Sequence, residues 1–417
     1  MNNRPLTAKI NDKGHLEIGG CDTTELAKQF GTPLYVLDEL TVRHNCRQYV
    51  STLKSKYPDS LVIYASKALC NTAILKMIAD EGLGADVSSG GELFTAKKAG
   101  IGPEKIYFHG NNKSRKEIEE GIAYGVKFVV DNFRELKNLD EISSSMDKQV
   151  EILFRVNPGI EAHTHEFIQT GKIDSKFGLQ KSEVASAVKI AKDSKRLDFI
   201  GLHAHIGSQI LDIDPYLIEV DILFSLAEGA KELNLGGGWG ISYLGEEVPP
   251  VPELLEKVIG KVKAKKNFAP RLVFEPGRSI VGQAGITLYT VSYVKDIPGI
   301  RKYAMVDGGM SDNPRPILYD ARYDAVVANR NEAPKITYRV AGRFCESGDV
   351  LIKEIKLPEI KEDDLLAVFA TGAYNYSMSS NYNRVPRPAM VMVGNGKAVS
   401  IIKRETYENL VEEDLCP

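Results

Sequence analysis

From about Tyr35 onward, short apolar runs rich in β-branched residues alternate with segments whose apolar residues recur at helical spacing. This alternation is typical of βα units, which build a parallel sheet covered by helices. Strands are predicted at Leu61–Tyr64, Ile106–Phe108, Phe128–Val130, Glu151–Val156, Phe199–His203 and Leu272–Phe274. Helices are predicted between them, at Thr72–Asp80, Gly91–Ala99, Lys116–Ala123 and Ser182–Lys192.

The side chains that look functional follow these predicted strands and do not precede them. A closed barrel of alternating strands and helices builds its active site at the C-terminal ends of its strands, so the pattern predicts such a barrel. An open, doubly wound sheet has the same property and is the alternative.

After about Gly285 the sequence changes to β-rich runs broken by Gly, Pro and Asn, which predicts an all-β second domain. Its strands are predicted at Ile286–Val294, Arg301–Val306, Ile336–Val340 and Ala389–Val393. Leu6–Ile18 also alternates like a strand and is expected to pair with this domain. Because 417 residues exceed the size of one hydrophobic core, we expect an N-terminal strand segment (1–34), an α/β barrel (35–284) and a C-terminal β domain (285–417).

The bulk composition is that of an ordinary globular protein. A formal net charge of −3 leaves no electrostatic footprint for nucleic acid or a membrane surface, so neither is expected as a partner. Met1–Ile10 is polar and no apolar run approaches the roughly 18 residues of a membrane span, so a cytoplasmic location is expected. The five cysteines are scattered without a Cys-x-x-Cys pair, which argues against zinc and against a disulfide framework.

Lys67 closes the apolar run Leu61–Lys67, where a strand is expected to end. If buried there, its ammonium loses solvation, its pKa falls, and the free amine can condense with an aldehyde such as pyridoxal phosphate (PLP). A solvent-exposed lysine is the commoner meaning of such a position, so the rest of the chain must supply a phosphate site and ring partners.

Two segments offer that surrounding site. In the glycine-rich run Leu235–Gly240 the backbone amides can approach a phosphate closely, although a tight turn explains the same glycines. Glu275–Arg278 follows the predicted strand Leu272–Phe274 and places a carboxylate near a guanidinium. A simple ion pair explains these charges, yet a carboxylate that faces a pyridine nitrogen also keeps that nitrogen protonated.

His203 and His205 lie at the end of another predicted strand, where an imidazole can lie against a flat aromatic ring. Alternate histidines are also a metal pattern, but neither a third ligand nor a zinc-like spacing is evident nearby, so no metal is expected. His163 and His165 form a second pair of the same ambiguity in a predicted loop.

The second domain carries a thiol beside a carboxylate, at Cys345 and Glu346, in the polar loop Gly342–Asp349. A cysteine in a polar loop is more plausibly reactive than one among apolar residues, and an inert, half-exposed thiol is the alternative. Gly372–Met378 and Asn381–Asn383 gather phenols and amides that can close a polar pocket or fill an interface.

Together these segments resemble the fold-type III PLP-dependent decarboxylases, and most closely the diaminopimelate decarboxylases among them. The similarity covers nearly the whole chain. The matching blocks are Tyr64–Lys67, Asp86–Glu92, Arg155–Gly159, Asp174–Gly178, His203–Gln209, the run from Gly236, Glu275–Arg278, Arg315–Tyr319, Cys345–Asp349 and Tyr374.

The resemblance implies an α/β plus all-β fold, in which a (β/α)8 TIM-type barrel of the alanine-racemase-like kind precedes a C-terminal β-barrel domain. It also implies a homodimer with shared active sites, to which the partner subunit contributes its own copies of the Cys345 and Glu346 pair. PLP is the implied cofactor, held covalently by Lys67, with His205 stacked on its ring and Glu275 paired with its pyridine nitrogen. The other implied cofactor contacts are Asp86, Arg155, Ser208, Gly237, Gly238, Gly277, Arg278 and Tyr374. The implied substrate contacts are Arg278, Arg315, Tyr319, Glu346 and Tyr374.

The activity implied by the resemblance is decarboxylation of meso-2,6-diaminopimelate to L-lysine and CO2, the last step of lysine biosynthesis. Lys67, Cys345 and His205 are the implied catalytic residues, and Cys345 is the candidate donor of the proton that replaces the lost carboxylate. Glu346 is expected to pair with the amine at the far end of this substrate, and Arg315 with the carboxylate there.

Two departures from the family pattern stand out. Arg343-Phe344 replaces a frequent Gly-Pro, and Asp221–Leu235 is short for a helix followed by a strand. The alternatives are a decarboxylase of ornithine, arginine or carboxynorspermidine, a racemase, and a non-catalytic regulator of the same fold. A regulator has no use for the whole catalytic and cofactor set, so its retention argues against that alternative.

Overall fold

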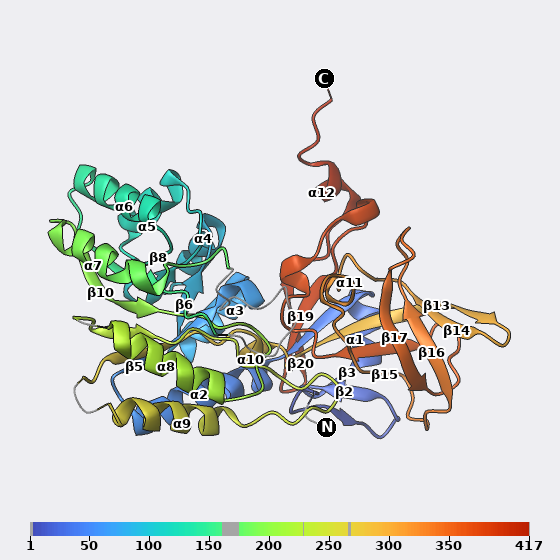
Figure 1. Cartoon of the computed structure of the whole chain (residues 1–417). Helices are drawn as coiled ribbons and strands as arrows, with labels where there is room; N and C mark the ends of the chain where they lie inside the picture. Colours follow the sequence, from blue (N-terminus) through green and yellow to red (C-terminus); the bar gives the residue numbers. More distant parts are fainter. Residues whose placement is uncertain (1–2, 161–174, 228, 266–267, 417) are drawn as a thin grey trace. The chain divides into compact units, whose positions relative to one another are not determined.

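The structure is a computed structural model that describes residues 3–160, 175–227, 229–265 and 268–416 (Figure 1). Its Cα positions fall into two compact units. The first unit comprises Met1–His44, Ile241–Glu247 and Ile280–Pro417, and the second comprises Asn45–Gly240 and Val248–Ser279. No helix in the described ranges has both the length and the apolar character that crossing a membrane requires.

The second unit contains a closed barrel of parallel strands, in which each strand pairs with the next and the last pairs with the first. In chain order these strands are β5 (Ser60–Ala65), β6 (Gly84–Val87), β7 (Ile106–Phe108), β8 (Lys127–Val130), β9 (Val150–Arg155), β10 (Leu197–His203), β11 (Glu232–Asn234) and β12 (Arg271–Phe274). The predicted TIM-type barrel is therefore confirmed, and the open doubly wound sheet is excluded.

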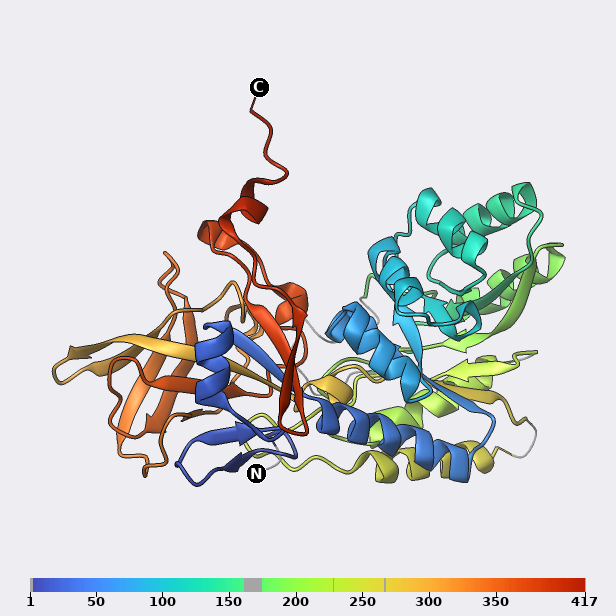
Figure 2. The ribbon, with the colours of Figure 1, turned by 180° about the vertical axis from the view of Figure 1, so that it is seen from behind.

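Helices cover the outside of the barrel, and α8 packs beside α9 (Figures 1 and 2). They are α2 (Glu39–Lys56), α3 (Thr72–Asp80), α4 (Gly90–Lys98), α5 (Arg115–Tyr124), α6 (Phe133–Ser145), α7 (Val184–Asp193), α8 (Asp214–Leu226) and α9 (Val251–Lys263). The short helix α10 (Arg278–Val281) follows β12. Polar side chains cap several of them. Asn71 and Asn132, for example, each accept the backbone N–H three residues later, which satisfies a donor that the helix leaves free.

Apolar side chains from the strands fill the barrel. Leu61 and Ile63 of β5 cluster with one residue from each of five other strands, and all of them are at most 9% exposed. The other members are Tyr107, Val129, Leu153, Ile200 and Val273. The barrel is thus a packed core rather than a pore, so chemistry is restricted to the ends of its strands.

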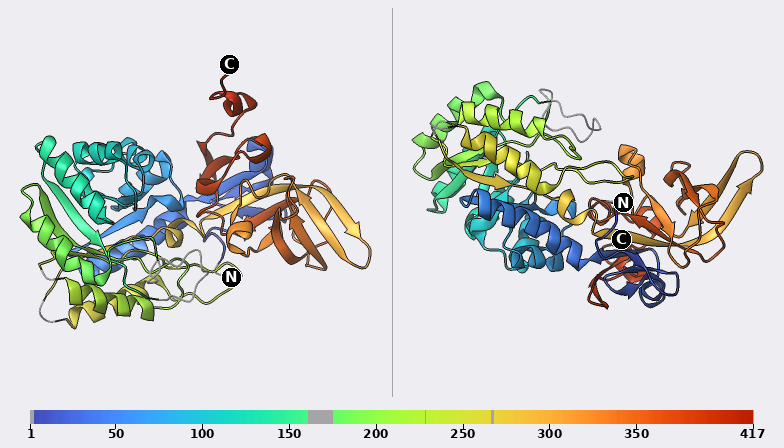
Figure 3. Two further views of the ribbon diagram at one scale, coloured as in Figure 1. Left: turned by 45° about the horizontal axis from the view of Figure 1, so that its top comes forward. Right: turned by 90° about the horizontal axis from the view of Figure 1, so that it is seen from below.

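The first unit is β-rich, which confirms the predicted second fold class. Its main sheet has nine strands, seven of them in the order β17-β16-β14-β13-β4-β19-β20, with β18 paired to both β13 and β15. The strands are β4 (Leu34–Asp38), β13 (Gly285–Ile297), β14 (Arg301–Val306), β15 (Ala325–Val327), β16 (Ile336–Ala341), β17 (Val350–Leu357), β18 (Leu365–Phe369), β19 (Ala389–Gly394) and β20 (Lys397–Ile402). The long strand β13 is plain in Figure 3. The short helices α11 (Arg315–Tyr319) and α12 (Tyr407–Val411) also belong to this unit.

The opening segment forms a small antiparallel sheet of β1 (Lys9–Ile10), β2 (Leu16–Ile18) and β3 (Cys21–Asp22), followed by α1 (Thr23–Phe30). Leu16 and Ile18 pack into the same apolar cluster as strands of the main sheet. Leu6–Ile18 is thus not one strand but two short strands, because the chain turns at Gly14 with a left-handed φ of +79°.

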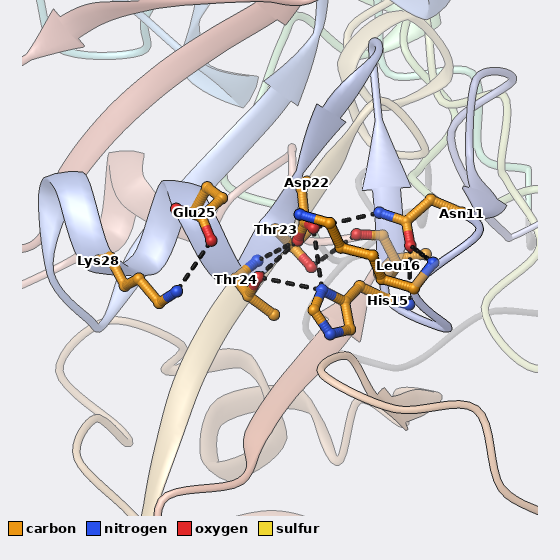
Figure 4. Close-up of polar contacts among 9 residues, drawn as sticks. Asn11, His15, Leu16, Asp22, Thr23, Thr24, Glu25 and Lys28 are labelled. Carbon is orange, nitrogen blue, oxygen red and sulfur yellow. Dashed lines mark hydrogen bonds and ion pairs between the residues drawn. The ribbon is translucent and has the colours of Figure 1, made fainter.

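Asp22 caps helix α1 by accepting the backbone N–H of Thr24 at 2.9 Å (Figure 4). His15 lies beside it, with Nδ1 2.9 Å from Asp22 Oδ2 and 3.2 Å from Thr24 Oγ1. Because the hydroxyl and the carboxylate both approach the same ring nitrogen, these side chains cap a helix and do not form a nucleophile relay.

Candidate active site

Lys67 lies on a single 3-10 turn, Ser66–Ala68, directly after β5. The Ser66 hydroxyl donates to the carbonyl of Asp86 at 2.6 Å, which fixes this turn against the end of β6. Ser66 and Ala68 are buried while Lys67 is exposed. Lys67 is therefore the exposed member of this turn, and the burial that was the condition for its lowered pKa is not met.

Asp86 lies on β6 and is only 3% exposed. Burial raises the pKa of its carboxyl to about 6, with the charge of Glu275 acting in the same direction and those of His109 and Lys67 opposing it. Its Oδ1 is buried and has no hydrogen-bond partner among the described residues. A buried acceptor of this kind is a place for a ligand atom.

Glu275 follows β12 and is the electrostatic centre of the barrel end. Asn234 Nδ2 donates to its Oε1 at 2.7 Å, and Nε2 of His109 lies 2.8 Å from the same oxygen. Nε2 of His203 lies 3.2 Å from Oε2. Although burial alone raises it, these two histidines hold the pKa of Glu275 well below its usual range, so the carboxylate is ionised.

His109 and Asn234 are contacts that the sequence analysis missed, although both stand at strand ends like the residues it found. The donor atoms of His109, His203 and Glu275 lie within 4.8 Å of one another, a grouping that also suits a metal ion. The third ligand escaped notice in the sequence because His109 is far from the other two. Direct contact of both imidazoles with the carboxylate accounts for this grouping without an ion.

His205 follows β10 and is half-buried. The backbone N–H of Gly237 donates to its Nδ1 at 3.2 Å, so Nδ1 is an acceptor and the ring proton belongs on Nε2. Burial, with the charges of Lys67 and Arg155, lowers the pKa of His205 well below its ordinary value. The side chain is a neutral imidazole, which suits packing against a flat ring.

The glycine run after β11 has no room for side chains. A Cβ on Gly237 would lie 2.1 Å from the carbonyl oxygen of Glu275, and one on Gly238 would lie 2.3 Å from that of Gly207. Gly238 also has a left-handed φ of +99°. Nearby, Arg278 donates to the Ser208 hydroxyl at 2.8 Å, which adds a cation to this end of the barrel. Bare backbone amides and a guanidinium are what a phosphate requires.

Two further predicted contacts also stand at strand ends. Arg155 ends β9, is 9% exposed, and stacks over the ring of Phe177 with its Cζ 4.2 Å from the centroid. Gly277 is hemmed in by Ala65 and Ala68, since a Cβ there would meet their side chains at 3.0 and 3.1 Å. Asp174, His163 and His165 lie outside the described residues.

The barrel end thus fits PLP on the evidence of this chain. An exposed lysine amine, an ionised carboxylate and a neutral imidazole stand at ends of strands of one barrel, beside a glycine run that excludes side chains. Asp86 Oδ1 and His203 Nδ1 are buried and have no hydrogen-bond partner among the described atoms. Unsatisfied polar atoms beside a side-chain-free backbone are what a polar, phosphorylated cofactor would complete.

The remaining predicted residues belong to the first unit. Arg315 and Tyr319 are one turn apart on α11. The Arg315 guanidinium is 5% exposed and donates to the hydroxyls of Tyr243 at 2.9 Å and Tyr323 at 2.5 Å. These two tyrosines were not found from the sequence. Tyr374, which is half-buried, has a left-handed φ of +61°.

Cys345 and Glu346 are both exposed on the loop after β16. Buried Asp349 anchors this loop by accepting the backbone N–H of Phe344 at 2.8 Å and that of Met310 at 2.7 Å. Phe344 stands where the family often has proline. Proline has no N–H, so Phe344 makes a hydrogen bond to the Asp349 carboxylate that a proline could not make.

Comparison with known proteins decides the family. Residues 42–282 match the model of the pyridoxal-dependent decarboxylase pyridoxal binding domain. The diaminopimelate decarboxylase of Bacillus subtilis is 47% identical over 98% of this chain and 97% of its own, and that of Bacillus methanolicus is 48% identical over 96% of each. The crystal structure of the M. jannaschii diaminopimelate decarboxylase with L-lysine superimposes with a TM-score of 0.95 at 36% identity, covering 100% and 99% of the two chains. The chain belongs to the diaminopimelate decarboxylase family.

The two compact units of this family member divide the predicted residues between them. The barrel unit holds the implied cofactor set except Tyr374, and there the charges of Lys67 and Glu275 act on Asp86 and His205. The β-rich unit holds Tyr374 and the implied substrate set except Arg278. PLP dependence and decarboxylase chemistry follow from the family.

Proposed function

We propose that this protein decarboxylates meso-2,6-diaminopimelate to L-lysine and CO2 as the last step of lysine biosynthesis. The observation that carries the proposal is Glu275, a buried carboxylate kept ionised by His109, His203 and Asn234 at the barrel end that also bears Lys67. Similarity over nearly the full chain to enzymes named for this substrate supports the choice of diaminopimelate.

PLP, when bound, supplies the electron sink that accepts the bonding electrons of the departing carboxylate. Lys67 provides the amine that holds it, and ionised Glu275 keeps a proton on the ring nitrogen. His205, kept neutral mainly by burial, would pack its imidazole against the cofactor ring, and the Gly237 N–H that donates to its Nδ1 would fix the tautomer. Gly237, Gly238, Gly277, Ser208 and Arg278 bind the phosphate, while Asp86 and Arg155 complete the polar lining.

The substrate requires a proton at Cα once its carboxylate has left. In this proposal the Cys345 thiol donates that proton and regains one from water, which its exposure permits. Glu346 binds the distal ammonium of diaminopimelate. Arg315 and Arg278, with the phenol of Tyr319, bind its distal carboxylate, and Tyr374 completes the substrate contacts.

The proposal includes a homodimer with shared active sites, to which the partner subunit contributes its Cys345 and Glu346 residues. It also includes a cytoplasmic location, as expected for a biosynthetic enzyme, and no nucleic-acid or membrane partner. The dimer rests on the resemblance to the family, whereas the location and the excluded partners rest on the net charge and the apolar pattern of the sequence.

The test is CO2 release by the PLP-loaded protein with meso-diaminopimelate, L-ornithine, L-arginine, carboxynorspermidine and L-lysine offered separately, with lysine formation followed in parallel. Release from meso-diaminopimelate alone, with equimolar lysine, is the expected result. Release only from another substrate would keep the cofactor chemistry and overturn the roles of Glu346 and Arg315. No release from any substrate would favour a non-catalytic relative.

A further inference from the structure

The segment Asn381–Asn383 contacts both members of the exposed Cys345–Glu346 pair. The backbone N–H of Cys345 donates to Asn383 Oδ1 at 3.1 Å. The phenol of Tyr382 donates to Glu346 Oε1, and the carboxylate in turn raises the pKa of that phenol. Asn383 therefore holds the backbone of Cys345, and its neighbour Tyr382 holds the carboxylate of Glu346.

This segment is itself well anchored. Asn381 Nδ2 and Arg387 Nε both donate to Glu405 at 2.6 Å, on either side of the contacts just described. The Tyr382 ring lies 6.1 Å from the ring of buried Phe344. Asn383 has a left-handed φ of +53°, a conformation that asparagine tolerates better than most residues and that few positions adopt without support. The contacts are therefore presented by a fixed backbone rather than by a loose loop.

A phenol on one oxygen of Glu346 has a directional consequence. The Tyr382 hydroxyl donates to Oε1 and restricts rotation of the carboxylate, so that Oε2 and the second lone pair of Oε1 meet a cation in a fixed direction. A fixed carboxylate binds an ammonium with less loss of side-chain entropy than a free one. In the same way, an acceptor for the Cys345 N–H fixes the backbone from which the thiol projects.

We propose that Tyr382 and Asn383 are positioning residues for the reaction, with Tyr382 orienting Glu346 toward the distal ammonium of the substrate and Asn383 orienting the Cys345 thiol. This inference rests on the proposed function, since it takes Glu346 as the amine-binding group and Cys345 as the proton donor. It divides the two tasks between two adjacent side chains. Loss of Tyr382 therefore weakens substrate binding, whereas loss of Asn383 slows proton return.

The experiment uses the PLP-loaded protein and three variants. Tyr382→Phe removes only the hydroxyl and keeps the ring against Phe344. Asn383→Gly removes the acceptor without straining the left-handed backbone, and Asn383→Asp restores an acceptor there. Asn395→Gly is the matched control, because Asn395 has a φ of +52° in an exposed turn between β19 and β20, outside the site.

Two readouts separate the roles. One is kcat and KM for meso-diaminopimelate, and the other is the rate of iodoacetamide alkylation of Cys345, followed on its own peptide. We expect Tyr382→Phe to raise KM about 3- to 10-fold with kcat and alkylation little changed. We expect Asn383→Gly to lower kcat about 10-fold at unchanged KM and to change the alkylation rate at least about 3-fold, with Asn383→Asp recovering both.

Unchanged KM in Tyr382→Phe overturns the role of Tyr382, and unchanged alkylation in Asn383→Gly overturns that of Asn383. Equal effects in Asn395→Gly would reduce both to general destabilisation. The alkylation rate needs no substrate. If the wild-type protein is inactive on meso-diaminopimelate but Asn383→Gly still changes the alkylation rate of Cys345, the proposed function is overturned. The positioning of Cys345 by Asn383 is then retained.

Discussion

Glu275 and Asp86 are buried carboxylates in one cluster whose pKa values move in opposite directions. Glu275 receives Asn234 and two imidazoles, and its pKa stays well below the usual range despite burial. Asp86 has the imidazole of His109 at the longer distance of 3.7 Å, and burial raises the pKa of its carboxyl to about 6. Separation of two carboxyl pKa values by their surroundings assigns them different tasks. Glu275 suits a permanent anion opposite a pyridinium, and Asp86 suits a group that gains or loses a proton near neutrality.

Asp86→Asn should stabilise the cofactor-free protein at alkaline pH. The folded pKa of about 6 lies above the unfolded value near 3.8, so ionised Asp86 lowers stability above about pH 6, and this penalty vanishes below the unfolded pKa. We expect the free energy of unfolding to rise by about 1–3 kcal/mol at pH 8, and by less at pH 5. Denaturant titrations at the two pH values measure it. A variant less stable than wild type at pH 8 would contradict the burial argument.

Lys67→Ala should abolish the visible absorbance of the purified, PLP-treated protein, because no other amine would hold the cofactor covalently at this strand end. Lys116→Ala is the matched control, since the Lys116 side chain is 84% exposed on α5. Spectra before and after reduction with borohydride measure the bound cofactor. Persistence of the wild-type spectrum in Lys67→Ala would move the attachment to another lysine.

Cys345→Ala should leave the cofactor spectrum intact and lower kcat at least about 100-fold, because proton donation by a positioned side chain typically contributes that much. The comparison is Cys416→Ala, which removes the other exposed thiol. Steady-state CO2 release and the absorbance spectrum are measured on the same samples. Full turnover in Cys345→Ala would exclude this thiol as the proton donor.

At the scale of elements, the glycine run after β11 passes so close to the end of β12 that Gly237 has no room for a side chain. Gly237→Ala places a Cβ 2.1 Å from the Glu275 carbonyl oxygen, so backbone must shift. We expect at least about a 10-fold loss of PLP affinity in equilibrium titration. In contrast, Gly260 lies within helix α9 with open space around it, and Gly260→Ala should stabilise the protein by about 0.5–1 kcal/mol without affecting PLP. Equal PLP affinities in the two variants would argue against a role of the glycine run in binding the phosphate.

The sequence predicted several elements whose apolar pattern is strong, although it missed the apolar strand β18. The predicted strand Ile106–Phe108 and helix Thr72–Asp80 have the observed bounds. Strands β6 and β11 were missed because Gly84–Val87 and Glu232–Asn234 are short and contain charged or polar residues. The segment Asp221–Leu235 seemed short only because α8 begins earlier, at Asp214, and β11 needs three residues.

In the candidate site, too, the sequence predicted what local pattern determines and missed what the folded chain determines. Residues adjoining a predicted strand, such as Glu275, were found from spacing and chemistry. The exposure of Lys67 depends on the direction of a tight turn, and the contact of His109 with Glu275 depends on barrel closure. The His109 contact has no signature in local sequence, because it arises from pairing between distant strands.

At the scale of the whole molecule, each of the two compact units is built from stretches that are separate in the sequence. Residues 35–44, predicted as the start of the barrel, group with the β-rich unit because β4 pairs with β13 and with β19. Ile241–Glu247 also leaves the barrel unit, so that the hydroxyl of Tyr243 meets Arg315. Pairing across some 250 to 350 residues cannot be deduced from composition, which placed this boundary after Leu34.

The proposed dimer makes a prediction about mixtures of inactive variants. If each active site combines one chain's Lys67 with the partner subunit's Cys345, a mixed dimer of Lys67→Ala and Cys345→Ala has one site with both defects and one with none. Random exchange makes half the dimers mixed, so the mixture should recover roughly a quarter of wild-type activity. Mild denaturation and refolding together, with each variant refolded alone as the control, measures it. Failure to recover activity, with exchange shown by mass spectrometry of differently tagged chains, would mean that each chain carries a complete site.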